Sequence, residues 1–284
     1  MAQSLFPGVA AAAAAALIAA LWQLTARHGV TTTLGPMELA VLRYGIPAVA
    51  LLPLLVRTAP RWRALPWGVQ LALFTGGGLP FGLLVLAGAQ FAPAAHMGIF
   101  MAGTMPVFTG LASHFFLGEQ LTRGRIFGLV LVALGAAVLA GTTWTAQATS
   151  WRGDLLFVLA AAMWAAYTIA FRRSGLAPWE GAAFVNGTSA LLLVPLALLA
   201  GIPRLATAPL ADIALQAAGQ GVLAGLLGLV VYSIAIRQLG AARASLSAAA
   251  VPLLTAAGGA WILGEQVSPA LAVAVVLATA GIAL

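Results

Sequence analysis

Residues 106–122 read PVFTGLASHFFLGEQLT, and residues 252–268 read PLLTAAGGAWILGEQVS. The two stretches agree at Pro, Thr, Leu, Gly, Glu and Gln, and in both a long apolar segment leads into the tetrapeptide LGEQ. A chain with six acidic residues thus places two of them, Glu119 and Glu265, at equivalent positions. This recurrence predicts an internal duplication.

A second pair of stretches extends the duplication toward the N-terminus. GPMELAVLRYGIPAVALLP at 35–53 aligns with APWEGAAFVNGTSALLLVP at 177–195, and Trp22 aligns with Trp164 at the same offset. The identical positions in these two stretches are Pro36 with Pro178, Glu38 with Glu180, Gly45 with Gly187 and Pro53 with Pro195. The repeat therefore covers nearly all of each half of the chain.

The composition shows which environment the chain occupies. It is 62% hydrophobic and 7% charged, with a mean hydropathy of +1.05, which excludes a soluble globular domain. About 20 helical residues cross the apolar core of a bilayer, so we expect ten spans. They lie at 5–26, 36–56, 66–89, 93–116, 124–141, 154–171, 178–200, 212–236, 241–263 and 267–284. These segments are too long and too evenly apolar to be strands of a membrane barrel.

Each predicted repeat, residues 1–146 and residues 147–284, contains five spans. Because five is odd, the second repeat enters the membrane from the opposite side, and the two repeats are inverted. The expected fold is an all-α membrane protein of ten transmembrane helices, built as two inverted five-helix repeats around a central cavity.

The net charge of +7 follows the expected topology. If the N-terminus is cytoplasmic, the inner loops hold nine of the thirteen arginines. By the positive-inside rule, both ends are then cytoplasmic, in a bacterial-type inner membrane. The charge is a topology signal, so no nucleic-acid partner is expected. The first apolar segment lacks a basic front end, and we expect it to be a span and not a cleaved signal.

The LGEQ copies are predicted to be helical hairpin turns. Gly118 and Gly264 suit the position just after a helix, and Thr122 and Ser268 suit the N-cap of the next one. Both glutamates are then at the membrane boundary, where each reaches water or the N–H groups of the following helix. A structural role is favoured over ion coupling.

The residue inventory excludes several function classes. The chain has no cysteine, no lysine and three histidines, so a thiolate metal site and a lysine-dependent ATP loop are excluded. The chain offers no nucleophile with a matching base from which an enzyme active site could be built. No cofactor or metal is expected. A channel and a lipid-flipping or scaffold role remain as alternatives to a carrier.

Two five-span inverted repeats, each with a proline about a dozen residues before a Gly-Glu turn, resemble the EamA-type transporters of the drug/metabolite transporter superfamily. Trp164-Ala165-Ala166-Tyr167 and Tyr232-Ser233 resemble, more narrowly, its aromatic amino-acid exporters. The resemblance implies a ten-helix basket in which four helices of each half surround a substrate cavity, and the fifth and tenth spans buttress it. Other members carry nucleotide sugars, sugar phosphates or drugs.

Three spans contain interruptions near the expected cavity. Span three carries Gly76-Gly77-Gly78 before Pro80, and Pro106 and Pro252 occupy equivalent points of spans four and nine. We expect hinges at these prolines, with the carbonyls of Ala102 and Ala248 freed for a substrate ammonium. The alternative is that neighbouring helices simply satisfy the backbone.

Aromatic and thioether side chains are the candidates for substrate binding. Trp164 lies near the middle of its span with Tyr167 on the same face, where rings stack on a side chain or hold an ammonium. The other expected substrate-binding residues are Trp22, Phe81, His96, Met97, Phe100, Met101 and Tyr232. Ordinary core packing is the competing interpretation for each.

Two polar or flexible features leave alternatives open. Arg43, inside span two, either pairs with Glu38, or snorkels to the interface, or faces the cavity and attracts a substrate carboxylate. Gly221, Gly225, Gly228 and Tyr232 in span eight are expected to share one helical face, and this stripe of glycines fits either helix packing or a smooth cavity wall.

The sequence thus predicts an exporter of aromatic or neutral amino acids, or of related small metabolites, that works by alternating access. No carboxylate falls at mid-membrane, which favours downhill transport. The alternative is a proton-coupled exporter of drugs or other metabolites, with His96 carrying the proton. The expected partners are a small-molecule substrate and the bilayer, and the oligomeric state stays open.

Overall fold

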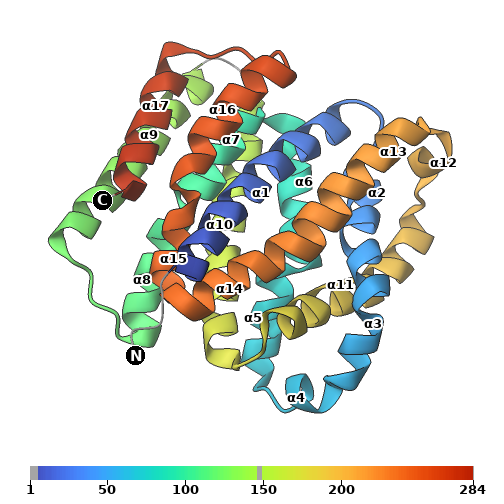
Figure 1. Ribbon diagram of the computed structural model, residues 1–284. Helices are drawn as coiled ribbons and strands as arrows, with labels where there is room; N and C mark the ends of the chain where they lie inside the picture. The colour runs from blue at the N-terminus through green and yellow to red at the C-terminus, as the bar shows by residue number, and fades with distance from the viewer. Residues whose placement is uncertain (1–5, 146–148, 284) are drawn as a thin grey trace.

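The computed structural model describes residues 6–145 and 149–283, and these form helices and no strands (Figure 1). The predicted boundary between repeats, at 146 and 147, lies outside the described residues. The helices are α1 (Phe6–Thr31), α2 (Pro36–Ala40), η1 (Val41–Gly45), α3 (Ile46–Arg57), α4 (Ala59–Arg63), α5 (Trp67–Gly77), α6 (Leu79–Phe91), α7 (Ala94–Met97), η2 (Gly98–Gly103), α8 (Met105–Leu117), α9 (Arg123–Thr145), α10 (Ser150–Ser174), α11 (Pro178–Ala200), α12 (Pro203–Thr207), α13 (Leu210–Gln216), η3 (Ala217–Gly228), α14 (Leu229–Leu239), α15 (Ala241–Ser245), η4 (Leu246–Ala250), α16 (Val251–Ile262) and α17 (Pro269–Ala283).

The ten expected spans all appear as helical segments. In the described residues, nine are long and apolar enough to cross a membrane, and the tenth, α17, is a shorter apolar helix of 15 residues. The all-helical membrane fold is therefore confirmed. Three spans contain a wide-turned π segment, namely η1, η2 and η3.

Packing between the two halves is reciprocal. The first span, α1, packs against α14 and α16 of the second half, and α10, the first span of that half, packs against α5, α6 and α8. The second spans of both halves meet as α3 and α11, and the fifth spans, α9 and α17, lie side by side at one edge (Figure 1). This exchange of contacts is that of two inverted repeats around a pseudo-twofold axis.

Both LGEQ copies form the expected turns. Gly118 and Gly264 have φ values of +69° and +67°, a left-handed conformation that glycine adopts without a steric penalty. The hydroxyl of Thr122 accepts the N–H of Arg125 at 3.3 Å, and the hydroxyl of Ser268 accepts the N–H of Leu271 at 3.1 Å. The predicted N-caps are therefore confirmed.

The expected partner of Glu265 was wrong. Its carboxylate accepts the N–H of Ala94, at 3.0 and 3.1 Å, and the Nε–H of Arg27, at 3.1 Å. The turn after α16 folds over the start of α7 and not over its own following helix. A carboxylate there satisfies a helix N-terminal donor and faces the positive end of the helix dipole.

Span three is interrupted at Gly78, two residues before Pro80. Gly78 is extended, with φ −97° and ψ −153°, between α5 and α6. Its carbonyl accepts the hydroxyl of Tyr44 at 2.6 Å, and the next N–H, from Leu79, donates to the hydroxyl of Ser189 at 2.9 Å. Side chains of spans two and seven thus satisfy the backbone at the break, as buried breaks require.

Pro106 and Pro252 also stand just after a change of helix type. Each occupies the second position of an α-helix, after the π segment η2 and Thr104 in one case and after the 3₁₀ segment η4 in the other. The expectation of a free carbonyl at Ala248 was wrong, because the N–H of Val251 donates to it. The tighter 3₁₀ turn supplies the donor that an α-helix loses at proline.

Candidate substrate cavity

A cavity lies between the two repeats and holds about 600 Å³ of empty space, part of it open to the surroundings. Spans one, two, three, four, six, eight and nine all contribute to its wall. The lining residues are Ala15, Ala16, Ile18, Ala19, Trp22, Gln23, Arg43, Phe81, Met101, Ala102, Met105, Trp164, Ala224, Gly228, Tyr232, Ser247, Ala248 and Val251. The apolar character of this lining is typical of a small-molecule site.

Four aromatic rings form a continuous wall of this cavity. The ring centroids of Trp22 and Phe81 are 6.0 Å apart, those of Phe81 and Trp164 are 5.0 Å apart, and those of Trp164 and Tyr232 are 5.3 Å apart. Trp22 and Trp164 are equivalent in the two repeats. The wall therefore joins both halves, and movement of one half against the other changes its shape.

The helix breaks help to shape this wall. Phe81 directly follows Pro80, Met105 directly precedes Pro106, and the residue before Pro252 is Val251. All three neighbours of these prolines line the cavity. The prolines themselves are not lining residues, so a hinge role for them stays a prediction.

Tyr167 lies behind the wall and not in it. Its ring centroid is 5.0 Å from that of Trp164, and its hydroxyl shares a 2.9 Å hydrogen bond with Ser233. Tyr232, which does line the cavity, shares a 3.3 Å hydrogen bond with Thr168. Tyr167 and Thr168 thus support the two aromatic residues that reach the cavity.

Of the four candidates in span four, only Met101 lines the cavity. Met97 and Phe100 are buried in the apolar core, at 0% and 4% exposure. His96 lies toward the end of span four that adjoins Pro93, where its Nδ1 is 2.8 Å from Oδ1 of Asp154. The structure therefore separates these three from the aromatic wall.

Arg43 is the charged residue among the described residues that line the cavity, and it is not one of the residues expected above to bind substrate. Its side chain is 2% exposed, and its guanidinium carbon lies 4.2 Å from the centroid of the Trp22 ring. Pairing with Glu38 was wrong, because Glu38 instead accepts the backbone N–H groups of Gly35 and Arg204. Snorkelling is also excluded by the burial. The sequence feature that could have predicted Arg43 as a cavity residue is its position as a charged residue in the interior of a span.

Gln23 was missed altogether. It is fully buried beside Trp22 and lines the same cavity. Neither its Oε1 nor its Nε2 has a hydrogen-bond partner among the described residues. A usable signal was present, since Gln23 corresponds to Ala165 in the other repeat, whereas the preceding tryptophans match.

Comparison with known proteins identifies the family. Residues 6–141 and 151–284 each match the EamA-like transporter family. The chain belongs to that family. A curated relative from Streptantibioticus cattleyicolor, named "Probable terminal-alkyne amino-acid exporter", is 31% identical over 261 residues, which is 88% of this chain and 84% of the relative. A solved structure described as "Crystal structure of protein" covers 96% of this chain and 94% of its own, with a TM-score of 0.67 and 23% identity.

Membership makes this EamA-like protein a multi-pass membrane transporter of small molecules and not a member of an enzyme class. The described residues contain no cluster of three or more His, Cys, Asp or Glu able to hold a metal ion. The cavity between the repeats is the place where such transporters of inverted-repeat design bind their cargo.

Proposed function

We propose that this EamA-like transporter exports aromatic or neutral amino acids, or closely related small metabolites, by facilitated alternating access. The observation that carries the proposal is the four-ring wall, built from both repeats around one cavity beside the helix breaks. Aromatic faces accept apolar and aromatic side chains. The 31% identical relative named as an amino-acid exporter supports the same cargo class.

Contacts at the two ends of the bundle suit a rocking motion. At one end, Glu265 of the second repeat joins Arg27 and the N–H of Ala94 of the first. At the other end, Arg61 of the first repeat pairs with Glu180 of the second. Breaking one set while keeping the other opens the cavity to one side at a time.

Downhill transport fits the placement of the acidic groups. None of the described residues that line the cavity is Asp or Glu. The described lining residues therefore offer no carboxylate that could pass protons beside the substrate. The buried His96–Asp154 pair is the observation that favours the second candidate, a proton-coupled drug or metabolite exporter.

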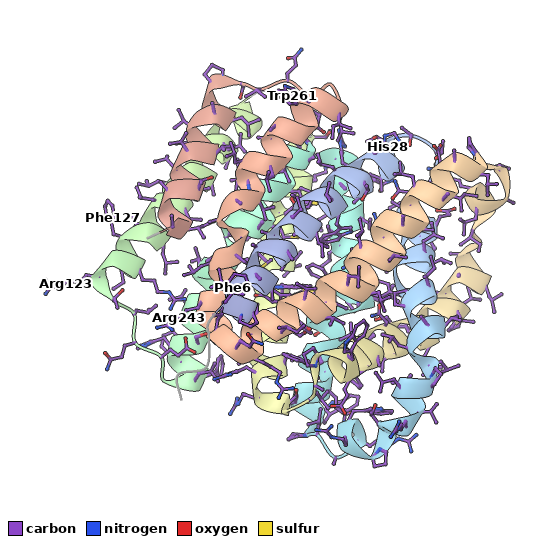
Figure 2. All side chains as sticks on the ribbon, viewed as in Figure 1. Phe6, His28, Arg123, Phe127, Arg243 and Trp261 are labelled. Carbon is purple, nitrogen blue, oxygen red and sulfur yellow. The ribbon has the colours of Figure 1, made fainter. Side chains whose placement is uncertain are left out.

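We place both termini in the cytoplasm, with the protein in a bacterial-type inner membrane. Arg123 and Arg243 lie toward the end of the bundle marked by Phe6, away from His28 and Trp261 (Figure 2). The positive-inside rule assigns the arginine-rich end to the cytoplasm.

Efflux from proteoliposomes tests the proposal. Purified protein is reconstituted, vesicles are loaded with labelled amino acids, and efflux is followed with and without an imposed pH gradient. Saturable efflux of an aromatic or neutral amino acid that ignores the gradient is expected. Failure of every amino acid to move contradicts the cargo, and flux that follows the gradient contradicts the downhill mechanism.

A further inference from the structure

The cavity contains buried polar groups that the protein leaves without partners. Nε and Nη1 of Arg43, both polar atoms of Gln23 and Nε1 of Trp164 are all buried and have no hydrogen-bond partner among the described residues. All three side chains line the same cavity. Buried polar groups are nearly always paired, and an unpaired buried charge is costly. Their convergence on one cavity points to a ligand that completes them.

The fold does not require these groups. At the aligned positions of the second repeat, Val185 replaces Arg43 and Ala165 replaces Gln23. Features that build the repeat, such as the LGEQ turns, occur in both halves. A polar pair present in one half only is thus better explained by recognition than by folding.

The cavity is also a site of uncompensated positive charge. The acidic side chains that pair with a basic side chain lie at span ends: Glu265 with Arg27, Glu180 with Arg61, and Asp154 with His96. None lines the cavity with Arg43. A guanidinium in a low-dielectric site attracts anions, and its planar fork matches the two oxygens of a carboxylate.

A ladder of amides holds the guanidinium in place. The N–H of the Trp22 indole donates to Oε1 of Gln220 at 2.8 Å. Nε2 of Gln220 in turn donates to Oε1 of Gln216 at 3.3 Å, and Nε2 of Gln216 donates to the carbonyl of Thr25 at 2.8 Å. This fixes the indole face on which Arg43 rests. The cation–π contact holds the charge without using Nε–H or the Nη1 hydrogens, which have no partner among the described residues.

We propose that Arg43, with Gln23 beside it, binds the carboxylate of the transported molecule, and that the substrates are small carboxylates with an apolar or aromatic side chain. This rests on the proposed transport function. The amino group is not a requirement, because none of the described residues that line the cavity is acidic and able to pair with it. The site therefore accepts deaminated analogues of aromatic amino acids and rejects amines that lack a carboxylate, which include most cationic drugs.

Competition in proteoliposomes tests this. The probes against labelled phenylalanine are phenylalanine, 3-phenylpropanoate, phenylalaninamide and phenethylamine. The first two are expected to inhibit flux, and the last two are not. Arg43→Gln should weaken inhibition by both carboxylates about 10- to 100-fold, as for loss of a charged hydrogen bond. Arg43→Lys should keep the order of the probes with weaker binding. Arg123→Gln, a change at the exposed first residue of α9, should behave as wild type.

Two results overturn carboxylate binding by Arg43: phenylalaninamide inhibits as strongly as phenylalanine, or the inhibition by the four probes is unchanged in Arg43→Gln. In either case, flux of phenylalanine still supports the proposed exporter. If phenylalanine does not move at all, the melting temperature of the purified protein decides. If 3-phenylpropanoate raises the melting temperature of wild type, Arg43→Gln should lose this effect and Arg43→Lys should lose or reduce it. That result supports carboxylate binding by Arg43 even though phenylalanine is not transported. No stabilisation by either carboxylate overturns both.

Discussion

The guanidinium carbon of Arg43 lies 4.2 Å from the centre of the Trp22 ring, and this contact joins the buried charge of the cavity to its aromatic wall. Trp22→Phe should keep a ring but lose the indole face and its bond to Gln220. Because a cation–π contact contributes about 0.5–2 kcal/mol, we expect the apparent affinity for phenylalanine to fall roughly 3- to 20-fold. The affinity is read from the concentration dependence of efflux. Trp261→Phe, at a residue that is 92% exposed on the protein surface, is the matched control and should leave flux unchanged.

Removing the charge should not harm the fold. An unpaired buried charge destabilises a protein, and replacing it by a neutral side chain of similar size is often neutral or stabilising. Arg43→Gln should therefore melt at or above the wild-type temperature, measured in detergent without substrate. A fall of several degrees would show that Arg43 holds the structure together and would argue against a binding role.

The turn after α16 should matter more than its repeat equivalent. Glu265→Ala removes the acceptor of the Ala94 N–H and the partner of Arg27, leaving a buried donor unpaired. We expect a loss of about 1–3 kcal/mol in unfolding free energy, seen as a lower melting temperature. Glu119→Ala is the matched control and should cost less, because the hydrogen bond between His114 and Glu119 uses the backbone carbonyl of Glu119, which the substitution keeps. Equal losses would contradict this difference between the turns.

Close packing of span eight on span two should make Gly225 irreplaceable. A Cβ on Gly225 would collide with the carbonyl oxygen of Arg43, and one on Gly221 would lie 2.9 Å from that of Leu42. Backbone cannot yield easily, so Gly225→Ala should lower the yield of folded protein and its melting temperature. Gly45→Ala, whose Cβ would meet nothing within 4 Å, is the control. Tolerance of Gly225→Ala would contradict the packing interpretation of this stripe.

The His96–Asp154 pair decides between the two candidate mechanisms. Arg27 and His96 line the same surface depression, so the charged groups near His96 are Asp154, Arg27 and Glu265. Downhill transport predicts that His96→Gln leaves efflux insensitive to an imposed pH gradient, as in wild type. A gradient-driven flux in wild type that His96→Gln abolishes would establish proton coupling instead.

Much of the fold follows from the sequence, because it depends on length, hydropathy and repetition. The duplicated LGEQ turns, with their positive-φ glycines and N-caps, and the break before Pro80 required only local chemistry. It was harder to predict which side chains face the cavity. Met97 and Met101 are four residues apart in span four, yet Met97 is fully buried in the apolar core and Met101 lines the cavity.

The polar part of the cavity was the least predictable. Whether Arg43 pairs with Glu38 or reaches the cavity depends on contacts between spans, and Glu38 is occupied by the backbone of Gly35 and of Arg204, which is 166 residues away. Gln23 offered only a mismatch between repeats. Packing between distant spans decides which partner such a polar side chain meets, and the spacing of residues along the sequence does not predict that packing.

Alternating exposure of the cavity is the central claim, and the absence of cysteine from the chain makes it directly measurable. Ala19→Cys places one thiol in the cavity wall, and Ala137→Cys places one on the exposed face of α9 as a control. A membrane-impermeant maleimide is applied to vesicles of each orientation, with and without phenylalanine. The account predicts labelling of Ala19→Cys from both faces, slowed by phenylalanine, and no protection of Ala137→Cys. Labelling of Ala19→Cys from one face only, or without protection by phenylalanine, would contradict it.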